Sequence, residues 1–140
     1  MEATIALRLP RDAASVPLIR RMLDAALASL GVVSTIRDDI ELMLTEACSN
    51  VIKHADPADE YTVSAAVQRD LCTIRVVDTG HGFDPAAMTA PSPSSESGRG
   101  LQIMRALADD VRFDNRHEHG AVVCLEKKLS YEPGAPLSVF

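Results

Sequence analysis

Four polar residues that can do chemistry recur along one edge of an expected helix. Glu46 and Asn50 stand four positions apart, which places their side chains about 40° apart around a helix axis and one turn apart along it. Lys53 and His54 follow a further turn on. A carboxylate can act as a general base, and an amide oxygen can bind a divalent cation. The same pattern is also typical of a solvated polar edge beside an apolar stripe.

Two further segments place glycines beside residues that can bind ligands. A β-branched run ends in Asp78, and Gly80 and Gly82 follow it. The carboxylate can accept a hydrogen bond, and the glycines let the backbone approach a planar ligand without a Cβ atom in the way. Farther along, Ser97-Gly98-Arg99-Gly100-Leu101 opens an expected helix, whose free N–H groups can bind an anion. Each segment alone is also explained as a Gly-rich turn or helix start.

The apolar spacing predicts the first elements that must position these residues. Alternation predicts a strand over residues 4–9, with Ile5, Leu7 and Leu9 on one side. A helix follows, with Ser15 as its N-cap and Gly31 as its C-terminal stop. Its expected apolar stripe consists of Ile19, Met22, Leu23, Ala26, Leu27 and Leu30. Arg20, Arg21 and Asp24 lie off that stripe.

The middle of the chain changes from helical to extended spacing. Thr35-Ile36-Arg37-Asp38 resembles a capping box, which predicts a second helix that runs to about His54. Alternating residues over 61–67 and 71–77 predict a hairpin. A stretch over 79–100 is dense in Gly, Pro and Ser, and such a long irregular stretch in a compact domain is usually functional. We expect it to form a lid.

The remaining segments complete the expected fold. A short helix from Leu101 to Ala108 precedes a last hairpin with strands near 111–115 and 121–127. This order of elements predicts an α+β fold, a two-layer sandwich with the helices on one face of the sheet. Residues 1–130 are expected to form one domain, and residues 131–140 a flexible tail.

Composition excludes several classes of function. The net charge of −6 argues against binding to DNA or anionic lipid, and with 4% aromatic residues the base-stacking platform of single-strand binders is largely missing. No uncharged stretch approaches the ~20 apolar residues of a membrane span, and nothing marks export, so a cytoplasmic protein with a protein partner is expected. Cys48, Cys72 and Cys124 are expected to be reduced core thiols rather than a zinc site.

In their order and separation, the three polar segments resemble the N, G1 and G2 boxes of the GHKL superfamily of ATP-binding domains. The resemblance covers roughly residues 4–129. More narrowly, residues 46–55 and 97–104 are similar to the bacterial anti-sigma factor serine-protein kinases of partner-switching systems. The resemblance implies a Bergerat-type (histidine-kinase-like ATPase) fold with a mixed, mainly antiparallel sheet.

By this resemblance, each position takes a role toward ATP or ADP. Glu46 would be the general base, Asn50 the protein ligand of Mg²⁺, and Asp78 the acceptor for the adenine amino group. Gly80 and Gly82 would pass close to the base and ribose. The other implied nucleotide-binding residues are Lys53, His54, Phe83, Gly98, Arg99, Gly100 and Leu101, of which residues 98–100 would close over the phosphates from the lid.

The implied function is an ATP-dependent serine/threonine-protein kinase that phosphorylates an anti-anti-sigma antagonist of the STAS type and also sequesters a sigma factor. Family members are homodimers, and the strand over 4–9 is expected to be a sheet edge available for pairing. Arg20 and Arg21 are the candidate partner contacts, with only Asp24 nearby as an internal mate.

Two alternatives stand beside this reading. Gly120 is followed by Ala121 and Val122, where the family often has hydroxyl residues that help to bind adenine, and the lid is short. The missing hydroxyls favour a nucleotide-gated partner-binding regulator with little or no kinase activity, and the short lid offers fewer contacts to nucleotide. A sensor histidine kinase would also need a dimerisation helix with a phosphoacceptor His, for which no part of these 140 residues is spare.

Overall fold

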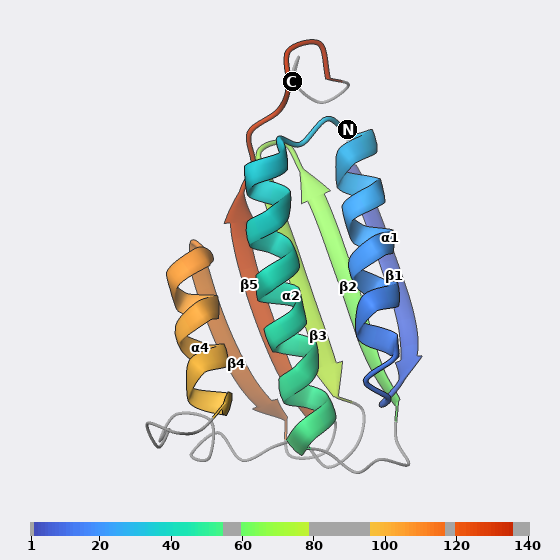
Figure 1. The fold of residues 1–140 in the computed structure, drawn as a ribbon, viewed down its shortest axis with the longest axis vertical. Helices are drawn as coiled ribbons and strands as arrows, with labels where there is room; N and C mark the ends of the chain where they lie inside the picture. Colours follow the sequence, from blue (N-terminus) through green and yellow to red (C-terminus); the bar gives the residue numbers. More distant parts are fainter. Residues whose placement is uncertain (1, 55–59, 79–95, 117–119, 136–140) are drawn as a thin grey trace.

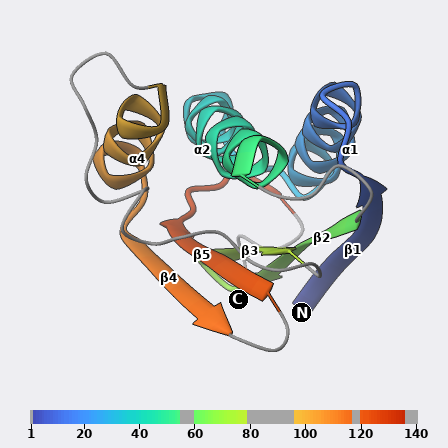
Figure 2. The ribbon, with the colours of Figure 1, turned by 90° about the horizontal axis from the view of Figure 1, so that it is seen from below.

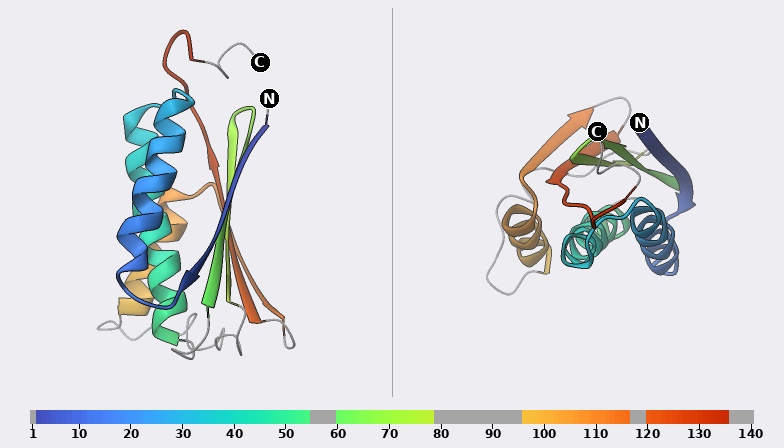
Figure 3. Two further views of the ribbon diagram at one scale, coloured as in Figure 1. Left: turned by 90° about the vertical axis from the view of Figure 1, so that its right-hand side faces the viewer. Right: turned by 90° about the horizontal axis from the view of Figure 1, so that it is seen from above.

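The fold consists of a helical layer packed on one face of a five-stranded sheet (Figure 1). The structure is a computed structural model that describes residues 2–54, 60–78, 96–116 and 120–135. Seen from below and from the side, all three described helices lie on the same side of the sheet, so the expected α+β two-layer architecture is confirmed (Figures 2 and 3). The elements in chain order are β1 (Glu2–Pro10), α1 (Ser15–Ser29), α2 (Ser34–His54), β2 (Glu60–Gln68), β3 (Leu71–Asp78), α4 (Glu96–Leu107), β4 (Asp110–Arg116) and β5 (Gly120–Lys128).

The sheet has the strand order β1-β2-β3-β5-β4, and β1 is an edge strand as expected. All four pairings among the described strands are antiparallel, where the sequence had predicted a mixed, mainly antiparallel sheet. The register places Leu9 of β1 opposite Tyr61 of β2, and Tyr61 opposite Asp78 of β3. One end of each of the three neighbouring strands β1, β2 and β3 therefore lies side by side, at the end of the sheet where Asp78 is located.

The core lies between the sheet and the helices and is almost entirely aliphatic. Every second residue of β2 and β3 is buried, as the alternating sequence predicts for strands with one covered face. Cys48 and Cys72 are buried free thiols, as expected, whereas Cys124 is only partly buried. Among the described residues, no helix is both long enough and apolar enough to cross a membrane. Fully buried large side chains include Ile19, Leu27, Ile40, Met43, Leu44, Val51, Ile74, Met104 and Leu125.

The end of α1 is fixed by Gly31, as predicted. Gly31 has a φ of 89°, which a residue without a Cβ atom adopts readily. Its N–H donates to the carbonyl of Ala28 over 3.0 Å, and the N–H of Val32 donates to the carbonyl of Leu27 over 3.0 Å. These two bonds form a Schellman motif, which satisfies the last carbonyls of the helix and turns the chain toward α2.

The starts of the first two helices differ from the sequence prediction. Ala14, not Ser15, occupies the N-cap position of α1 and makes no side-chain capping bond. Helix α2 begins at Ser34, so Thr35 lies inside the helix and the expected capping box is wrong. Met22, expected in the apolar stripe of α1, is 41% exposed. Its place on the edge of the stripe leaves it outside the contact between α1 and the sheet.

Two segments expected to be irregular are ordered in part. Helix α4 begins at Glu96, so the last residues of the expected lid, 96–100, are helical, and residues 79–95 lie outside the described part of the chain. Tyr131 forms an isolated antiparallel bridge with Val32, and the N–H of Glu132 donates to the carbonyl of Gly31 over 2.7 Å. Residues 131–135, expected to belong to a flexible tail, are therefore held against the α1–α2 junction.

Candidate functional site

Most of the candidate residues that the structure describes lie on segments that meet at one end of the molecule. The last turns of α2, the end of β3, the end of β1 and the first turns of α1 and α4 all reach the lower end in Figure 1. Because these segments come from four separated stretches of sequence, their meeting at one end is a property of the fold. This end of the molecule is the candidate site.

Gly100 of α4 lies directly against the polar edge of α2. A Cβ atom built on Gly100 would be 2.8 Å from Oε2 of Glu46 and 3.6 Å from Oδ1 of Asn50. A distance below 3.0 Å would force the carboxylate to move, so only glycine fits here without displacing Glu46. The structure thus brings together the carboxylate, the amide and the glycine that the sequence proposed for one site.

Asn50 is 2% exposed, yet its Nδ2 has no hydrogen-bond partner within the described residues. A buried amide group without a partner costs free energy, so this position favours a ligand or an ion that the amide can contact. Rotation of the amide about its last torsion exchanges Nδ2 and Oδ1 and would present an oxygen instead. The oxygens of Asn50 and Glu46 are of the kind that Mg²⁺ accepts, with water and phosphate oxygens as its remaining ligands.

Asp78 is fully buried and forms an ion pair with Arg11, whose side chain is also fully buried. Arg11 follows the end of β1, and Asp78 is the last residue of β3, so the pair crosses the end of β2. Sequence reasoning did not identify Arg11. The only local signal was a basic residue in the turn after an apolar strand, and nothing local reveals a partner that lies 67 positions later.

A second buried cluster lies under the site and was also missed. The hydroxyls of Ser15 and Tyr61 are 2.5 Å apart, and Ser15 also donates to the carbonyl of Asp12 over 2.7 Å. Tyr61 is further hydrogen-bonded to the thiol of Cys48 on α2. Burial raises the pKa of Tyr61 and that of Cys48 each to about 12. The cluster therefore stays neutral and joins α1, β2 and α2 behind the polar residues.

Several predicted site residues cannot be placed. Gly80, Gly82 and Phe83 lie outside the described residues. Lys53 and His54 end α2, with side chains that also fall outside the described set. The segment 98–100, expected to cover phosphates as part of a loop, lies instead in the first two turns of α4. Within that segment and beside it, Arg99 is exposed and Leu101 is buried.

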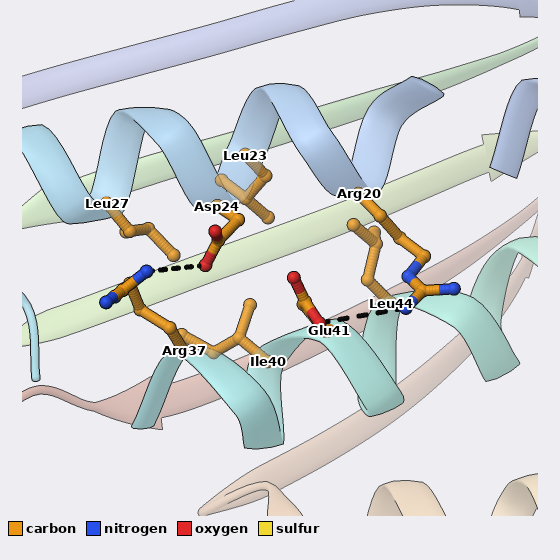
Figure 4. Close-up of a pocket in the computed structure, with 8 residues that line it drawn as sticks. All are labelled: Arg20, Leu23, Asp24, Leu27, Arg37, Ile40, Glu41 and Leu44. Carbon is orange, nitrogen blue, oxygen red and sulfur yellow. Dashed lines mark hydrogen bonds and ion pairs between the residues drawn. The ribbon is translucent and has the colours of Figure 1, made fainter. Parts of the chain in front are cut away.

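Arg20 and Arg21, the candidate partner contacts, lie in the second turn of α1. Arg20 forms an ion pair of 3.7 Å with Glu41 of α2, while Asp24, expected to be its mate, pairs instead with Arg37 over 3.0 Å (Figure 4). Side chains of both helices fill the groove between these two ion pairs. A cleft of about 180 Å³ opens beside it, lined by Pro17, Arg20, Arg21 and Glu41.

The chain resembles known proteins over most of its length. The family described as "Histidine kinase-like ATPase domain" matches residues 9–127. Among curated relatives, the serine-protein kinase RsbW of Bacillus cereus is 27% identical over an alignment of 152 positions, which covers 97% of this chain and 94% of the relative. The serine-protein kinase RsbW of Bacillus subtilis is 29% identical over an alignment of 141 positions, which covers 91% of this chain and 87% of the relative.

Solved structures share the same fold at low sequence identity. The RsbU and RsbW domains of Rv1364c from Mycobacterium tuberculosis superpose with a TM-score of 0.72 at 20% identity, covering 93% of this chain and 33% of that longer chain. The SiaB-SiaC complex from Pseudomonas aeruginosa gives 0.65 at 14% identity, covering 89% of this chain and 88% of that chain. The catalytic domain of the histidine kinase ThkA gives 0.56 at 12% identity, covering 89% and 95%.

Proposed function

Because the chain belongs to the histidine kinase-like ATPase domain family, as the resemblance of its three polar segments predicted, we propose that it is an ATP-dependent serine/threonine-protein kinase. Its substrate would be an anti-anti-sigma protein of the STAS type, and it would sequester a sigma factor when that antagonist is phosphorylated. Relatives named serine-protein kinase RsbW that align over nearly the whole chain support this choice. The observation that carries the proposal is the contact of Gly100 with Glu46 and Asn50.

In this proposal, the chain contributes position and charge rather than covalent chemistry. Phosphoryl transfer depends mainly on aligning the nucleophile with the γ-phosphate and stabilising charge. Glu46 would accept the proton of the incoming serine or threonine hydroxyl. Asn50 would hold Mg²⁺ through its amide oxygen, and the bound ion would neutralise charge on the phosphate oxygens. Asp78, at the end of β3, would accept a hydrogen bond from the amino group of adenine.

One observation favours a second candidate, a nucleotide-gated partner-binding regulator with little or no kinase activity. Val122 of β5 pairs with Val77, the neighbour of Asp78, and is only 4% exposed. The strand beside the proposed base site therefore carries an isopropyl group, where a hydroxyl would have supplied a further hydrogen bond to the base. Such a site would bind nucleotide weakly and would serve as a switch more readily than as a catalyst.

A phosphotransfer assay separates the two candidates. The chain is incubated with Mg·ATP labelled at the γ-phosphate and with the STAS-type protein that co-purifies with it. We expect label on that protein, and Glu46→Gln should lower the rate by about 10²- to 10⁴-fold, the range for loss of a general base. Asp38→Asn removes an exposed carboxylate from the same helix and serves as the control. Nucleotide binding without transfer in the wild-type chain would favour the regulator.

The proposal extends to partners and assembly. Arg20 and Arg21 border the cleft between α1 and α2, and they would contact acidic surfaces of both the sigma factor and the antagonist. An ATP-dependent kinase of this kind would act in the cytoplasm, where ATP is available. The free edge of β1 would pair with a second copy, giving a homodimer.

A further inference from the structure

The ion pair between Arg11 and Asp78 occupies the carboxylate that the proposed function assigns to the nucleotide base. We propose that Arg11 is an internal competitor of the base: its guanidinium holds Asp78 in the nucleotide-free protein and must release it before an adenine amino group can bind. This inference rests on the proposed function, because that function makes Asp78 the base acceptor. It adds a residue of this chain that sets nucleotide affinity and base selectivity.

The backbone holds Arg11 at this position. Arg11 follows Pro10, the last residue of β1, and the N–H of Asp12 donates back to the carbonyl of Pro10 over 2.8 Å. The Asp12 carboxylate in turn accepts a hydrogen bond of 3.0 Å from the N–H of Ala14 at the start of α1. This tight connection between strand and helix restricts where the Arg11 side chain can go. From this fixed backbone position, the guanidinium crosses the end of β2 to pair with Asp78.

Burial decides which partner of Asp78 binds more strongly in the absence of nucleotide. Both side chains of the pair are fully buried, so each charge has lost its hydration. A hydrogen bond between two charged groups is stronger than one between a carboxylate and a neutral amino group. In this proposal, the base must therefore displace a charged partner, and the form in which Arg11 holds Asp78 predominates until nucleotide binds.

Such a competitor lowers the apparent affinity in a defined way. When only a fraction of the protein can bind a ligand, the dissociation constant rises by the inverse of that fraction. If Arg11 covers Asp78 in nine of ten molecules, its removal should tighten nucleotide binding by about tenfold. Removal of Arg11 should also raise the ratio of the affinity for adenine to the affinity for a base without an amino group. Asp78 could then bind the amino group without first releasing Arg11.

Calorimetry with Mg·ATP and Mg·ITP on the wild-type chain, Arg11→Met and Arg11→Gln tests this inference. Inosine carries a carbonyl where adenine carries the amino group, so the ratio of the two affinities reports contact with Asp78. We expect Arg11→Met to bind ATP about tenfold more tightly than the wild type and to show a larger preference for ATP over ITP. Arg11→Gln, which keeps a polar side chain, should likewise bind ATP more tightly and show a larger preference for ATP over ITP. It replaces Arg11→Met in the test if that variant does not fold.

The outcomes distinguish this inference from the proposed function. Equal or weaker ATP binding in a folded Arg11 variant, with clear binding in the wild type, would overturn the inference and make Arg11 a residue that positions Asp78 for the base. In that case, the proposed function would stand. Absence of ATP binding at millimolar concentration in the wild type and in both folded variants would overturn the proposed function and, with it, the inference.

Discussion

Gly100 of α4 faces the carboxylate of Glu46 on α2 so closely that a Cβ atom at position 100 would lie 2.8 Å from Oε2. Gly100→Ala should therefore push the carboxylate aside while leaving the helix intact. Alanine is favoured over glycine inside a helix by about 0.5–1 kcal/mol, so the free energy of unfolding should stay within roughly 1 kcal/mol of the wild type. Phosphotransfer should fall by about 10²-fold, because a misplacement of about 1 Å has effects of that size.

The control for this prediction is Gln102→Ala, which changes an exposed residue on the same helix. Urea unfolding and the phosphotransfer assay are measured on both variants. Loss of stability in parallel with loss of activity in Gly100→Ala would mean that the glycine serves packing alone. Full activity in that variant would show that Glu46 can move without consequence for the reaction.

The buried pair of Arg11 and Asp78 predicts strong coupling in a double-mutant cycle. Removing one partner leaves an uncompensated buried charge, so Arg11→Met and Asp78→Leu should each lower the free energy of unfolding by about 3–5 kcal/mol. The double variant replaces both charges with apolar groups. Its loss in the free energy of unfolding should be far smaller than the sum of the losses in the two single variants. Urea unfolding of the four proteins measures the coupling. Additive losses would argue that the two residues do not stabilise each other.

Partner binding should depend on Arg20 more than on its ion pair with Glu41. That pair is partly exposed and spans 3.7 Å, so Glu41→Gln should change the free energy of unfolding by only about 0.2–1 kcal/mol. Without that mate, Arg20 is available to an acidic partner, and affinity should hold or rise. Arg20→Glu should weaken the complex by about 2–5 kcal/mol if the partner buries this residue. Titration calorimetry with the STAS-type protein measures the affinity of both variants for that partner. An unchanged affinity in Arg20→Glu would place the interface elsewhere.

The stability of the fold should fall in alkaline solution because of two buried thiols. Burial raises the pKa of Cys48 and of Cys72 to about 12, against 9.0 in an exposed thiol. The folded state thus favours the protonated thiols, so their contribution is present below pH 9 and is lost as the pH rises from about 9 to about 12. Urea unfolding under reducing conditions at pH 8 and pH 10.5 measures this, and Cys72→Ala should show a smaller difference between the two pH values.

The same burial predicts the order of thiol reactivity. Burial also raises the pKa of Cys124, but this thiol is only partly buried, so it should react faster with a thiol reagent in the native state at pH 8 than the buried Cys48 and Cys72. All three thiols should react in denaturant. Rapid reaction of all three in the native protein would contradict the packing of α2 against the sheet.

The free edge of β1 predicts a homodimer. An edge strand presents unpaired backbone groups that can pair with a second strand. Light scattering should therefore give about twice the chain mass of 15.1 kDa, with a mass that falls on dilution if the association is weak. A constant monomer mass up to high micromolar concentration would contradict pairing through β1.

Local sequence signals were sufficient for most of the fold. The period-2 runs predicted β2 and β3 to within a residue or two, because their buried and exposed faces alternate without interruption. Gly31 predicted the end of α1, because its conformation is a property of that residue and its neighbours. The edge shared by Glu46 and Asn50 was also predicted, since the spacing of four along a helix places them together.

Two of the errors, at Ser15 and Gly100, and the failure to identify Arg11 arise from contacts with distant residues. Ser15 resembles an N-cap in sequence, but its hydroxyl is bonded to Tyr61, which lies 46 positions away. Gly100 has a low intrinsic helix propensity, which favoured a loop, yet its lack of a side chain is what allows α4 to pack against Glu46. The local sequence did not reveal the role of Arg11, because that role depends on its ion pair with the distant Asp78.

The pairing of β1 with β2 also dictates an order of assembly. Two complete helices separate these strands in the chain, whereas β2 and β3 are joined by a turn of only two residues, Arg69 and Asp70. Local pairings form faster than pairings between distant segments, so the β2–β3 hairpin should form first and nucleate the sheet. During synthesis, β1 stays unpaired until its partner β2 has been translated. Arg11 can reach Asp78 only once β1 has docked, so the base site is completed after the β2–β3 hairpin has formed.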